Sequence, residues 1–409
     1  MKIGYILTTF PCRSETFAVR EIDALRRMGF EIIVFAAASE SFGNESEDHC
    51  DAVYRPSLFS FETACSLAHI LHRHPLSVIR LLWLALRLTR SCAREALRVL
   101  GNIHTVACFT RHLNRMAVAH IHAYFLSWPG TIALATSVAT GRSFSISTHA
   151  RDIFVEHGDM ELKVSHASFV RVCNHEGMDY LKANLSQRYH HKLRLNYHGV
   201  TDSLQGATLG LRRTHNADDD EIVAAIGRLI PKKGFDILLK AFAQVVETGQ
   251  PCRLTLFGDG CERGRLSDLG TQLDLGDRVR FAGWREPEVV LNYVRRASVV
   301  VVPSIIADDG DRDGLPNVVL EAFINKTPVI GSDLAGIRDA IENRRTGLLV
   351  DPADAPALAS AIKELLSDKD MQSRLACNAY ELAIQRFDLT QNVAQMAEWF
   401  EDVCGREGS

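Results

Sequence analysis

Short runs of apolar residues alternate along this chain with longer segments in which apolar residues recur every three or four positions. Residues 3–7 form the first run, residues 15–28 carry Ala18 and Ile22 on one helical face, and residues 31–36 form the next run. A run of four to eight apolar residues is typical of a buried strand, whereas the longer spacing is typical of a helix packed on one side. The order predicts strand, helix, strand, the unit of a parallel sheet.

The same alternation continues in two separate series. The first resumes with strand-like segments at residues 119–122 and 143–148, and a second begins beyond the polar stretch 201–221. The strands predicted in the second series are residues 222–226, 253–257, 279–281, 299–302 and 328–330. Two such series predict an α/β protein with two doubly wound, Rossmann-like domains that face a cleft. In such sheets, ligands bind outside the carboxyl ends of the strands.

The length of 409 residues agrees with two domains. We place an N-terminal domain at residues 1–205 and a C-terminal domain at residues 206–386, because the polar stretch between the two series is the best candidate for a linker. The closing residues 387–409 carry apolar side chains at helical spacing and are predicted to form a separate helix.

A basic segment interrupts the first series. Residues 63–115 contain eight arginines and a single acid, Glu95. Four arginines recur every seven residues: Arg73, Arg80, Arg87 and Arg94. Leucines, an isoleucine and Trp83 fill much of the remaining surface. A helix with a basic stripe beside apolar residues can lie in an anionic membrane interface, and the alternative is an ordinary surface helix with a solvated arginine face.

Composition and charge exclude several classes of protein. The chain is 46% hydrophobic and 23% charged, with a formal net charge of −4, which excludes a disordered chain and a strongly basic nucleic-acid-binding protein. Residues 1–210 carry 22 basic and 18 acidic side chains, residues 211–409 carry 24 and 32, and all 16 histidines lie between His49 and His215. We therefore expect no nucleic acid as a partner and different partners for the two halves.

The cysteines and the first residues indicate the compartment. Ten cysteines are scattered without a Cys-x-x-Cys pair, which fits a reducing cytosol and gives no signal for a zinc or redox motif. The apolar run at the start is too short for a signal peptide. We expect a cytoplasmic protein.

Residues 227–236 read GRLIPKKGFD and follow a predicted strand. Arg228 and Lys233, at the carboxyl end of that strand, can converge on a diphosphate, since arginine offers paired donors and lysine a point charge. Gly227 and Gly234 let the backbone approach a ligand closely. An ordinary basic turn between strand and helix remains the alternative.

Residues 313–323 read DGLPNVVLEAF, and Pro316 fits the first turn of a helix. The free N–H groups of a helix start can receive phosphate or sugar oxygens. Glu321, near the same end, can accept hydrogen bonds from ribose hydroxyls, although an ordinary helix salt bridge is the alternative.

The acidic residues just before this helix also resemble the opening of a calcium loop. Asp309, Asp311 and Asp313 have the required spacing, but Leu320 stands where the bidentate glutamate should be and Pro316 starts a helix too early. We expect no metal ion at this place.

Together the motifs of the second half resemble glycosyltransferase family 4, whose members are retaining nucleotide-sugar enzymes with the GT-B fold. The pieces that carry the resemblance, in order, are residues 227–234, Gly258-Asp259-Gly260, Pro303-Ser304, residues 313–321, Gly336-Ile337 and residues 346–350. By this resemblance Arg228 and Lys233 hold the donor diphosphate, and Glu321 binds the donor ribose. Asp313 takes the position near the transferred sugar, where the family usually has glutamate.

The resemblance implies further donor contacts. The residues concerned are Gly258, Gly314, Leu315, Pro316 and Asn317, of which the last four would contact sugar hydroxyls and the diphosphate through their backbone. Retaining transfer in the family needs neither a metal ion nor another cofactor. Arg228, Lys233 and the helix start would stabilise the charge that develops on the departing diphosphate.

The first half resembles mainly the family members of exopolysaccharide and colanic-acid biosynthesis. The matching pieces are residues 14–17, 120–125 and 149–152. By resemblance His149 ends a strand and touches the transferred sugar, while His120, His122 and Glu15 are weaker candidates for the acceptor side of the cleft. The closing residues 387–409 resemble the terminal GT-B helix that crosses back onto the N-terminal domain.

The function implied is transfer of a sugar from a nucleoside-diphosphate sugar to a growing oligosaccharide. The basic segment and the exopolysaccharide-like resemblance indicate a polyprenyl-diphosphate-linked acceptor, with the protein peripheral on the inner face of the cytoplasmic membrane. Two alternatives share the architecture: a nucleotide-sugar epimerase or hydrolase that uses no acceptor, and a non-catalytic partner protein.

Overall fold

The computed structural model describes residues 1–12, 15–40, 52–156, 158–201 and 221–407. It divides into two compact units. The first comprises Met1–Cys173, Gly177–Tyr197 and Gln391–Ser409, and the second comprises Asn174–Glu176 and His198–Thr390. Most of the predicted linker, residues 202–220, lies outside the described residues, as do two residues of the loop that follows the first strand.

A parallel seven-stranded sheet forms the centre of the first unit, in the order β3-β2-β1-β4-β5-β6-β7. Its strands are β1 (Lys2–Thr9), β2 (Glu31–Ala38), β3 (Ala52–Tyr54), β4 (His120–Ala123), β5 (Phe144–Thr148), β6 (Val170–Val172) and β7 (Leu193–Leu195). The chain moves outward from β1 in one direction and then returns to β4 on the other side. The apolar runs predicted as strands are therefore buried strands of one doubly wound sheet.

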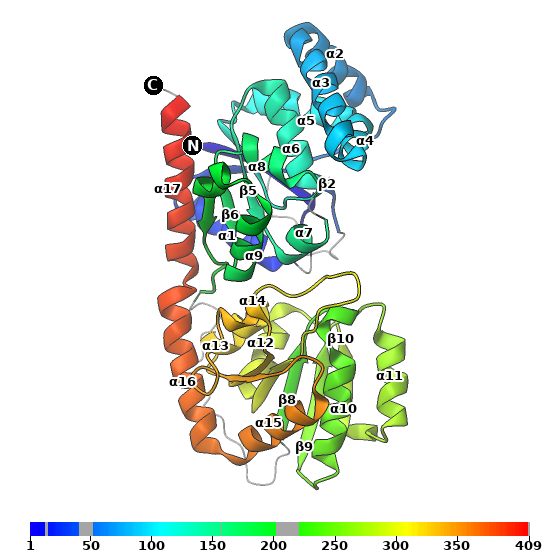
Figure 1. Ribbon diagram of the computed structural model, residues 1–409, viewed down its shortest axis with the longest axis vertical. Helices are drawn as coiled ribbons and strands as arrows, with labels where there is room; N and C mark the ends of the chain where they lie inside the picture. Colours follow the sequence, from blue (N-terminus) through cyan, green and yellow to red (C-terminus); the bar gives the residue numbers. More distant parts are fainter. Residues whose placement is uncertain (13–14, 41–51, 157, 202–220, 408–409) are drawn as a thin grey trace. The chain divides into compact units, whose positions relative to one another are not determined.

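Helices cover this sheet (Figure 1). They are α1 (Thr16–Arg27), α2 (Phe61–Arg73), α3 (Pro75–Ser91), α4 (Ala93–Gly101), α5 (Ile103–Met116), α6 (Trp128–Thr140), α7 (Ala150–Phe154), α8 (Met160–His166), α9 (His175–Asn184) and the closing helix α17 (Leu389–Glu407). Phe400 of α17 is fully buried and packs its ring against Tyr5 of β1 and Phe169 beside β6. The last helix is thus part of the core of the first unit.

The second unit repeats the architecture with a six-stranded parallel sheet in the order β10-β9-β8-β11-β12-β13. Its strands are β8 (Glu221–Ile226), β9 (Cys252–Phe257), β10 (Val279–Gly283), β11 (Val299–Val302), β12 (Val329–Ser332) and β13 (Leu348–Val350). Its helices are α10 (Phe235–Val246), α11 (Arg263–Gln272), α12 (Pro287–Arg296), α13 (Asn317–Ile324), α14 (Ala335–Arg338), α15 (Ala355–Ser367) and α16 (Lys369–Arg386). The strand order reverses between β8 and β11, and such a switch point is where open α/β sheets bind ligands.

The predicted fold class, two doubly wound α/β domains, is confirmed by these two sheets. The sequence explains why: each of the four residues of β11 is buried, as expected for a strand covered on both faces. In α10, Phe235, Leu238 and Phe242 are buried at helical spacing.

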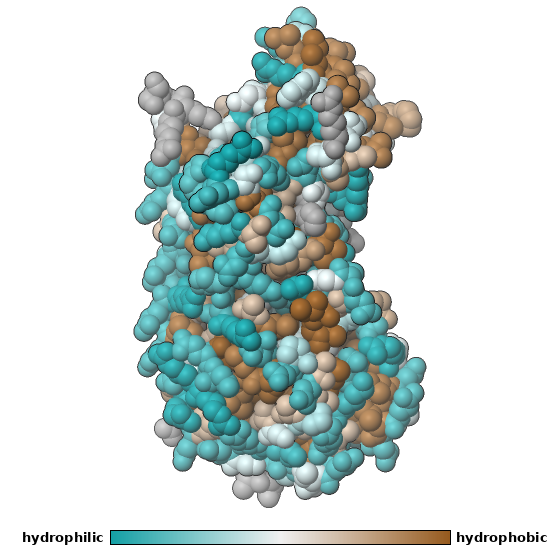
Figure 2. All heavy atoms as spheres, viewed as in Figure 1, coloured by the Kyte–Doolittle hydropathy of each residue, from teal (hydrophilic) through white to brown (hydrophobic). Residues whose placement is uncertain are grey.

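The basic segment is four helices rather than one continuous stripe. Pro75 and Cys92 lie at the breaks between α2, α3 and α4, and α2 packs on α5 while α3 packs on α4 and α6. Large apolar side chains on α2–α4 and the turn before them remain exposed: Leu58, Phe59, Phe61, Leu71, Leu76, Ile79, Leu82, Trp83, Leu86, Leu97 and Leu100. Figure 2 shows this hydrophobic surface as brown spheres over these helices. No helix in the described part of the chain is both long and apolar enough to cross a membrane.

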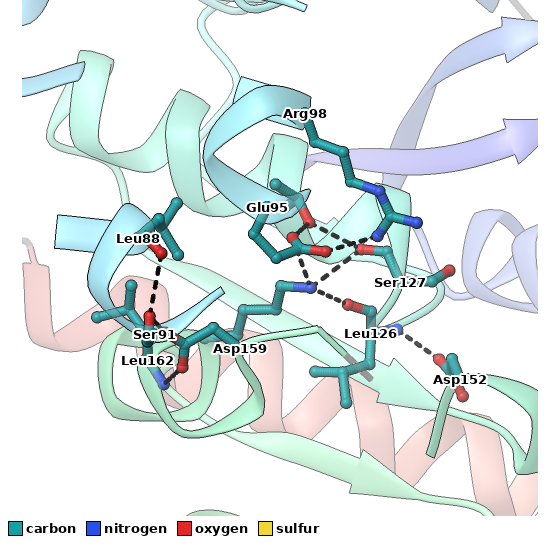
Figure 3. A network of polar contacts seen from close by, with 11 residues as sticks. Leu88, Ser91, Glu95, Arg98, Leu126, Ser127, Asp152, Asp159 and Leu162 are labelled. Atoms are coloured by element: carbon teal, nitrogen blue, oxygen red, sulfur yellow. Dashed lines mark hydrogen bonds and ion pairs between the residues drawn. The ribbon is translucent and has the colours of Figure 1, made fainter. Parts of the chain in front are cut away.

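A buried polar network ties α4 to the rest of the first unit (Figure 3). The Lys163 ammonium lies 3.2 Å from Oε2 of Glu95 and donates to the carbonyl of Leu126 at 2.8 Å. Arg98 contacts the other oxygen of Glu95 at 2.6 Å, and Thr131 donates to the same carboxylate. Burial alone would raise the pKa of Glu95, but Lys163, Thr131 and Arg98 outweigh it and hold that pKa below its usual value. Glu95, the single acid of the basic segment, therefore joins α4 to the interior of the first unit through buried ion pairs.

We predict that Lys163→Met lowers the free energy of unfolding by about 3–5 kcal/mol, because the buried Glu95 charge then loses its one buried cationic partner among the described residues and keeps only the partly exposed Arg98. Urea denaturation of the full chain measures this loss. The double variant Glu95→Leu/Lys163→Met removes both charges and should recover most of it. Equal destabilisation of the single and double variants would show that packing, and not the unpaired charge, causes the loss.

Candidate active site

The turn between β8 and α10 brings the first motif to the carboxyl edge of the second sheet. Gly234 has a positive φ of 59°, and a Cβ there would lie 2.0 Å from the carbonyl oxygen of Pro303, so only glycine fits. The N–H of Ile305 donates to the carbonyl of Lys232 at 2.8 Å. This turn is consequently packed directly on the segment that leaves β11, across the switch point of the sheet.

Asp313 is the centre of the site. Lys233 donates to its Oδ2 at 2.7 Å, the hydroxyl of Ser304 donates to the same oxygen at 2.6 Å, and Lys232 lies 3.6 Å from Oδ1. Asp313 is only 7% exposed. Burial acts to raise the pKa of this carboxyl, but Lys233 and Lys232 outweigh burial and lower the pKa. Asp313 is therefore an ionised, buried carboxylate that fixes the position of the Lys233 ammonium.

Lys232 has a structural partner of its own. Its ammonium lies 3.0 Å from Oδ1 of Asp311 and donates to the carbonyl of Arg312 at 3.2 Å. The carboxylates that share the spacing of a calcium loop are thus bound by lysines, and Asp309 accepts from the N–H of Asp311. The sequence analysis did not connect Lys232, Asp311 or Ser304 with Lys233, and their burial in one cluster is what the structure adds.

Arg228 is close in sequence to Lys232 and Lys233, but unlike them it is exposed to solvent. Its side chain is exposed, and no hydrogen bond or ion pair joins it to another residue in the described part of the chain. The loop around it is fixed: Gly258 has a φ of 129°, and a Cβ there would lie 2.0 Å from the carbonyl oxygen of Gly227. The guanidinium is therefore available to an anionic ligand while its backbone is held by close glycine packing.

The second motif starts a short helix at the same edge. Pro316 precedes α13, and Glu321 is the fifth residue of that helix and partly buried. A Cβ on Gly336, in α14, would lie 2.5 Å from the carbonyl oxygen of Gly314, so this loop also depends on a close backbone approach. Leu315 and Asn317 are partly exposed. Backbone groups of residues 314–317 are thereby held at the start of a helix, where N–H groups favour anions.

In the first unit, His149 follows β5 and precedes α7. Its backbone N–H donates to Oδ1 of Asp152 at 2.6 Å, and its ring lies 4.6 Å from that of Phe125 and 5.4 Å from that of Phe17. Burial, with a smaller effect of Arg171, lowers the pKa of His149 to about 3. The imidazole is neutral at physiological pH, as expected for a side chain that exchanges hydrogen bonds with a neutral hydroxyl.

His120 and His122 do not line a surface, and here the sequence-based expectation is wrong. Both are fully buried in β4 and alternate with Ser143, which precedes β5, and with Ser145 and Ser147 of β5 in a continuous ladder of hydrogen-bonded side chains. The contacts of this ladder are His120 Nδ1 to Ser143 Oγ at 2.8 Å, His120 Nε2 to Ser145 Oγ at 2.8 Å, His122 Nδ1 to Ser145 Oγ at 2.8 Å and His122 Nε2 to Ser147 Oγ at 3.0 Å. Burial lowers the pKa of His120 to about 3, so it is neutral in the core.

Glu15, the other weak candidate, lies in the loop between β1 and α1. It precedes the first residue of α1 and is partly buried. Behind this edge lies an ion pair that the sequence did not reveal, between Glu21 of α1 and Arg171 of β6, both almost fully buried. Tyr5 and Tyr124 donate to the same carboxylate. The carboxyl edge of the first sheet therefore rests on a buried, fully connected polar cluster.

Comparison with known proteins shows which sequences and structures this chain is similar to. Residues 211–382 match the family described as Glycosyl transferases group 1. Alpha-D-kanosaminyltransferase of Streptomyces kanamyceticus is 30% identical over 47% of this chain and 48% of its own length. The lipopolysaccharide core biosynthesis glycosyltransferase LpsE of Rhizobium meliloti is 32% identical over 41% of this chain and 46% of its own. The chain thus spans about half the length of these two relatives.

One relative matches along most of both chains. A protein of Escherichia coli described as a colanic acid biosynthesis glycosyltransferase, WcaL, is 26% identical over 88% of this chain and 90% of its own. Among solved structures, Anabaena HepE in complex with UDP has a TM-score of 0.73 at 20% identity, and sucrose-phosphate synthase of Thermosynechococcus elongatus has 0.74 at 23%. These alignments cover 98% and 99% of this chain, respectively, and all of each solved chain. The described chain therefore has the GT-B fold, and its second unit carries the features of a group 1 glycosyl transferase domain.

Proposed function

We propose that this protein is a retaining glycosyltransferase that moves a sugar from a nucleoside-diphosphate sugar to a lipid-linked oligosaccharide in exopolysaccharide biosynthesis. The observation that carries the proposal is the arrangement at the switch point of the second sheet. There Lys233 is fixed by the buried Asp313, and the exposed Arg228 lies on the same turn. The relatives named for colanic acid and lipopolysaccharide core biosynthesis support the same class of product.

In this proposal the donor diphosphate binds between the β8–α10 turn and the start of α13. Arg228 supplies paired donors, the helix start supplies backbone N–H groups, and Glu321 accepts the ribose hydroxyls. HepE, which has a similar fold, was solved with UDP and with UDP-glucose, and this favours a uridine nucleotide here. Breaking the bond to the sugar leaves negative charge on the diphosphate. Cations already held in place stabilise that charge without reorganising during the reaction.

Asp313 has a defined part in this scheme. It is one methylene shorter than the glutamate usual in the family, and Lys233, Lys232 and Ser304 already engage its carboxylate. We assign to it the positioning of Lys233 beside the donor diphosphate. His149 is then the candidate from the first unit for contact with the transferred sugar, as a neutral imidazole.

The proposed lipid-linked acceptor agrees with the surface of α2–α4. Arg73, Arg80, Arg87 and Arg94 are exposed, as are the apolar side chains of the same helices. Glu95, the only acid of the segment, is fully buried and paired, so it does not offset the positive surface charge. Exposed leucines and a tryptophan beside arginines can enter the headgroup region of an anionic bilayer. We propose that this surface holds the protein at the inner face of the cytoplasmic membrane.

We predict that UDP raises the melting temperature of the full chain more than GDP or ADP does. A ligand that binds only the native state stabilises it by about 2.7 kcal/mol when its concentration is a hundred times Kd. Differential scanning fluorimetry with the three nucleotides measures the effect, and Arg228→Ala should abolish it. A melting temperature that none of the nucleotides changes would contradict the donor site.

We predict that Arg228→Ala and Lys233→Ala each lower kcat/KM by about thirtyfold to a thousandfold, since each removes about 2–4 kcal/mol of transition-state stabilisation. The measurement is transfer of radiolabelled sugar from a UDP-sugar into the lipid extract of membranes. Arg374→Ala, at an exposed position of α16, is the matched control and should keep wild-type turnover. Near wild-type turnover in either site variant would refute the assignment. Release of UDP that does not depend on acceptor would favour a hydrolase.

We predict that charge reversal at Arg80, Arg87 and Arg94 weakens binding to vesicles that contain anionic lipid by at least about a hundredfold. Each basic residue near such a surface contributes about 1 kcal/mol. Co-sedimentation with anionic and with zwitterionic vesicles measures the difference, and Arg374→Glu is the control for net charge. Equal binding of the triple variant and the wild type would exclude this surface as the membrane contact.

A further inference from the structure

Two helices of the first unit face each other with metal-ligating side chains. Glu62 stands in the first turn of α2, and Cys108 and His112 stand one turn apart on α5, against which α2 packs. The Nε2 of His112 lies 2.9 Å from Oε1 of Glu62, and the sulfur of Cys108 lies 3.6 Å from the same oxygen. All three ligand atoms lie within 4.8 Å of one another. A thiol, an imidazole and a carboxylate thus converge on one point.

The burial of these groups leaves the cluster open on one side. Cys108 is fully buried, whereas the side chains of His112 and Glu62 are 20% and 44% exposed. Burial and Glu62 raise the pKa of the Cys108 thiol to about 12, against a lowering effect of Arg111 and of the Ser66 hydroxyl. Without a cation, the thiol therefore keeps its proton. The sulfur is thus buried, whereas the other two groups reach solvent.

Ser66 gives independent support. It lies one turn after Glu62 on α2 and is fully buried. Its hydroxyl has no hydrogen-bond partner within the geometric limits for a hydrogen bond among the described residues, yet it lies near enough to Cys108 to favour the thiolate. A buried hydroxyl beside the sulfur can donate to a thiolate, and such outer contacts commonly support the ligands of a metal ion.

We infer that Glu62, Cys108 and His112 form a binding site for a zinc-like divalent cation, with solvent as the fourth ligand. Zn²⁺ takes this mixture of sulfur, nitrogen and oxygen. With its usual bond lengths, a tetrahedral ion holds its ligand atoms about 3.3–3.5 Å apart. Two of the present separations, 2.9 and 3.6 Å, already bracket that range. The thiolate and the carboxylate together balance the charge of the ion, and binding releases the thiol proton to water.

This site is independent of the proposed sugar transfer. Its ligands come from two helices, and Glu62 lies 46 residues before Cys108, so no local sequence motif contains all three of them. An ion there would join α2 to α5 by three bonds. Because α2 carries part of the exposed apolar surface, the ion would also fix the base of that surface.

The test uses the full chain after treatment with a chelator and its removal. Co²⁺ serves as a spectroscopic probe, because a thiolate bound to Co²⁺ gives a charge-transfer absorption that the thiol does not. We expect this absorption at one equivalent of Co²⁺, its displacement by Zn²⁺, and its loss in Cys108→Ser. Glu62→Gln keeps the size of a partly exposed side chain and should fold normally, while weakening Zn²⁺ binding by about tenfold or more.

Matched controls separate this site from the other cysteines and histidines. Cys377→Ser and His72→Ala replace exposed residues of the same types and should leave both the absorption and the Zn²⁺ affinity unchanged. Absence of the charge-transfer absorption in the wild type would overturn the proposal. It would also be overturned if the absorption persisted in Cys108→Ser, or if Glu62→Gln bound Zn²⁺ as tightly as the wild type.

Discussion

The carboxylate of Asp313 is the constraint on which the carboxyl edge of the second sheet depends. A charge with so little access to water must be paired, and the two lysines of the β8–α10 turn provide the pairing. Ser304 adds a hydrogen bond from the segment that leaves β11. Two segments that are far apart in sequence, the β8–α10 turn and the segment between β11 and α13, are thereby held around one small, buried charge. The ammonium groups of the two lysines stay at this edge of the sheet, where a diphosphate could bind them.

Much of this arrangement follows from the sequence. The apolar runs predict the strands because a parallel sheet covered on both faces needs continuous burial, as β11 shows. Gly234 was expected to let the backbone approach a ligand, and in the structure Gly234 and Gly258 let it approach carbonyl oxygens of this chain so closely that a Cβ would meet them. What periodicity cannot supply is which loops meet. The pairing of Lys232 with Asp311 spans 79 residues, and no local pattern links them.

The errors have physical causes too. By resemblance His120 and His122 were expected on the acceptor side of the cleft, but both are fully buried, and Ser145 and Ser147 of β5 satisfy them inside the core. The arginine repeat suggested one helix, whereas a proline at the start of α3 and a break at Cys92 divide it. The surface of that segment is nevertheless more positive than its composition suggests. Its single acid, Glu95, is internal and therefore does not offset the charge of the exposed arginines.

The serine–histidine ladder has a consequence for how the first sheet assembles. Inward and outward faces alternate along a strand, so a shift of β4 against β5 by two residues would leave every apolar side chain on its proper face. The core would hardly resist such a slip. The ladder does resist it, because the shift would leave one imidazole nitrogen without its serine partner, at a cost of about 1–3 kcal/mol for an unsatisfied buried group. The alternating serines and histidines thus favour one register of β4 against β5.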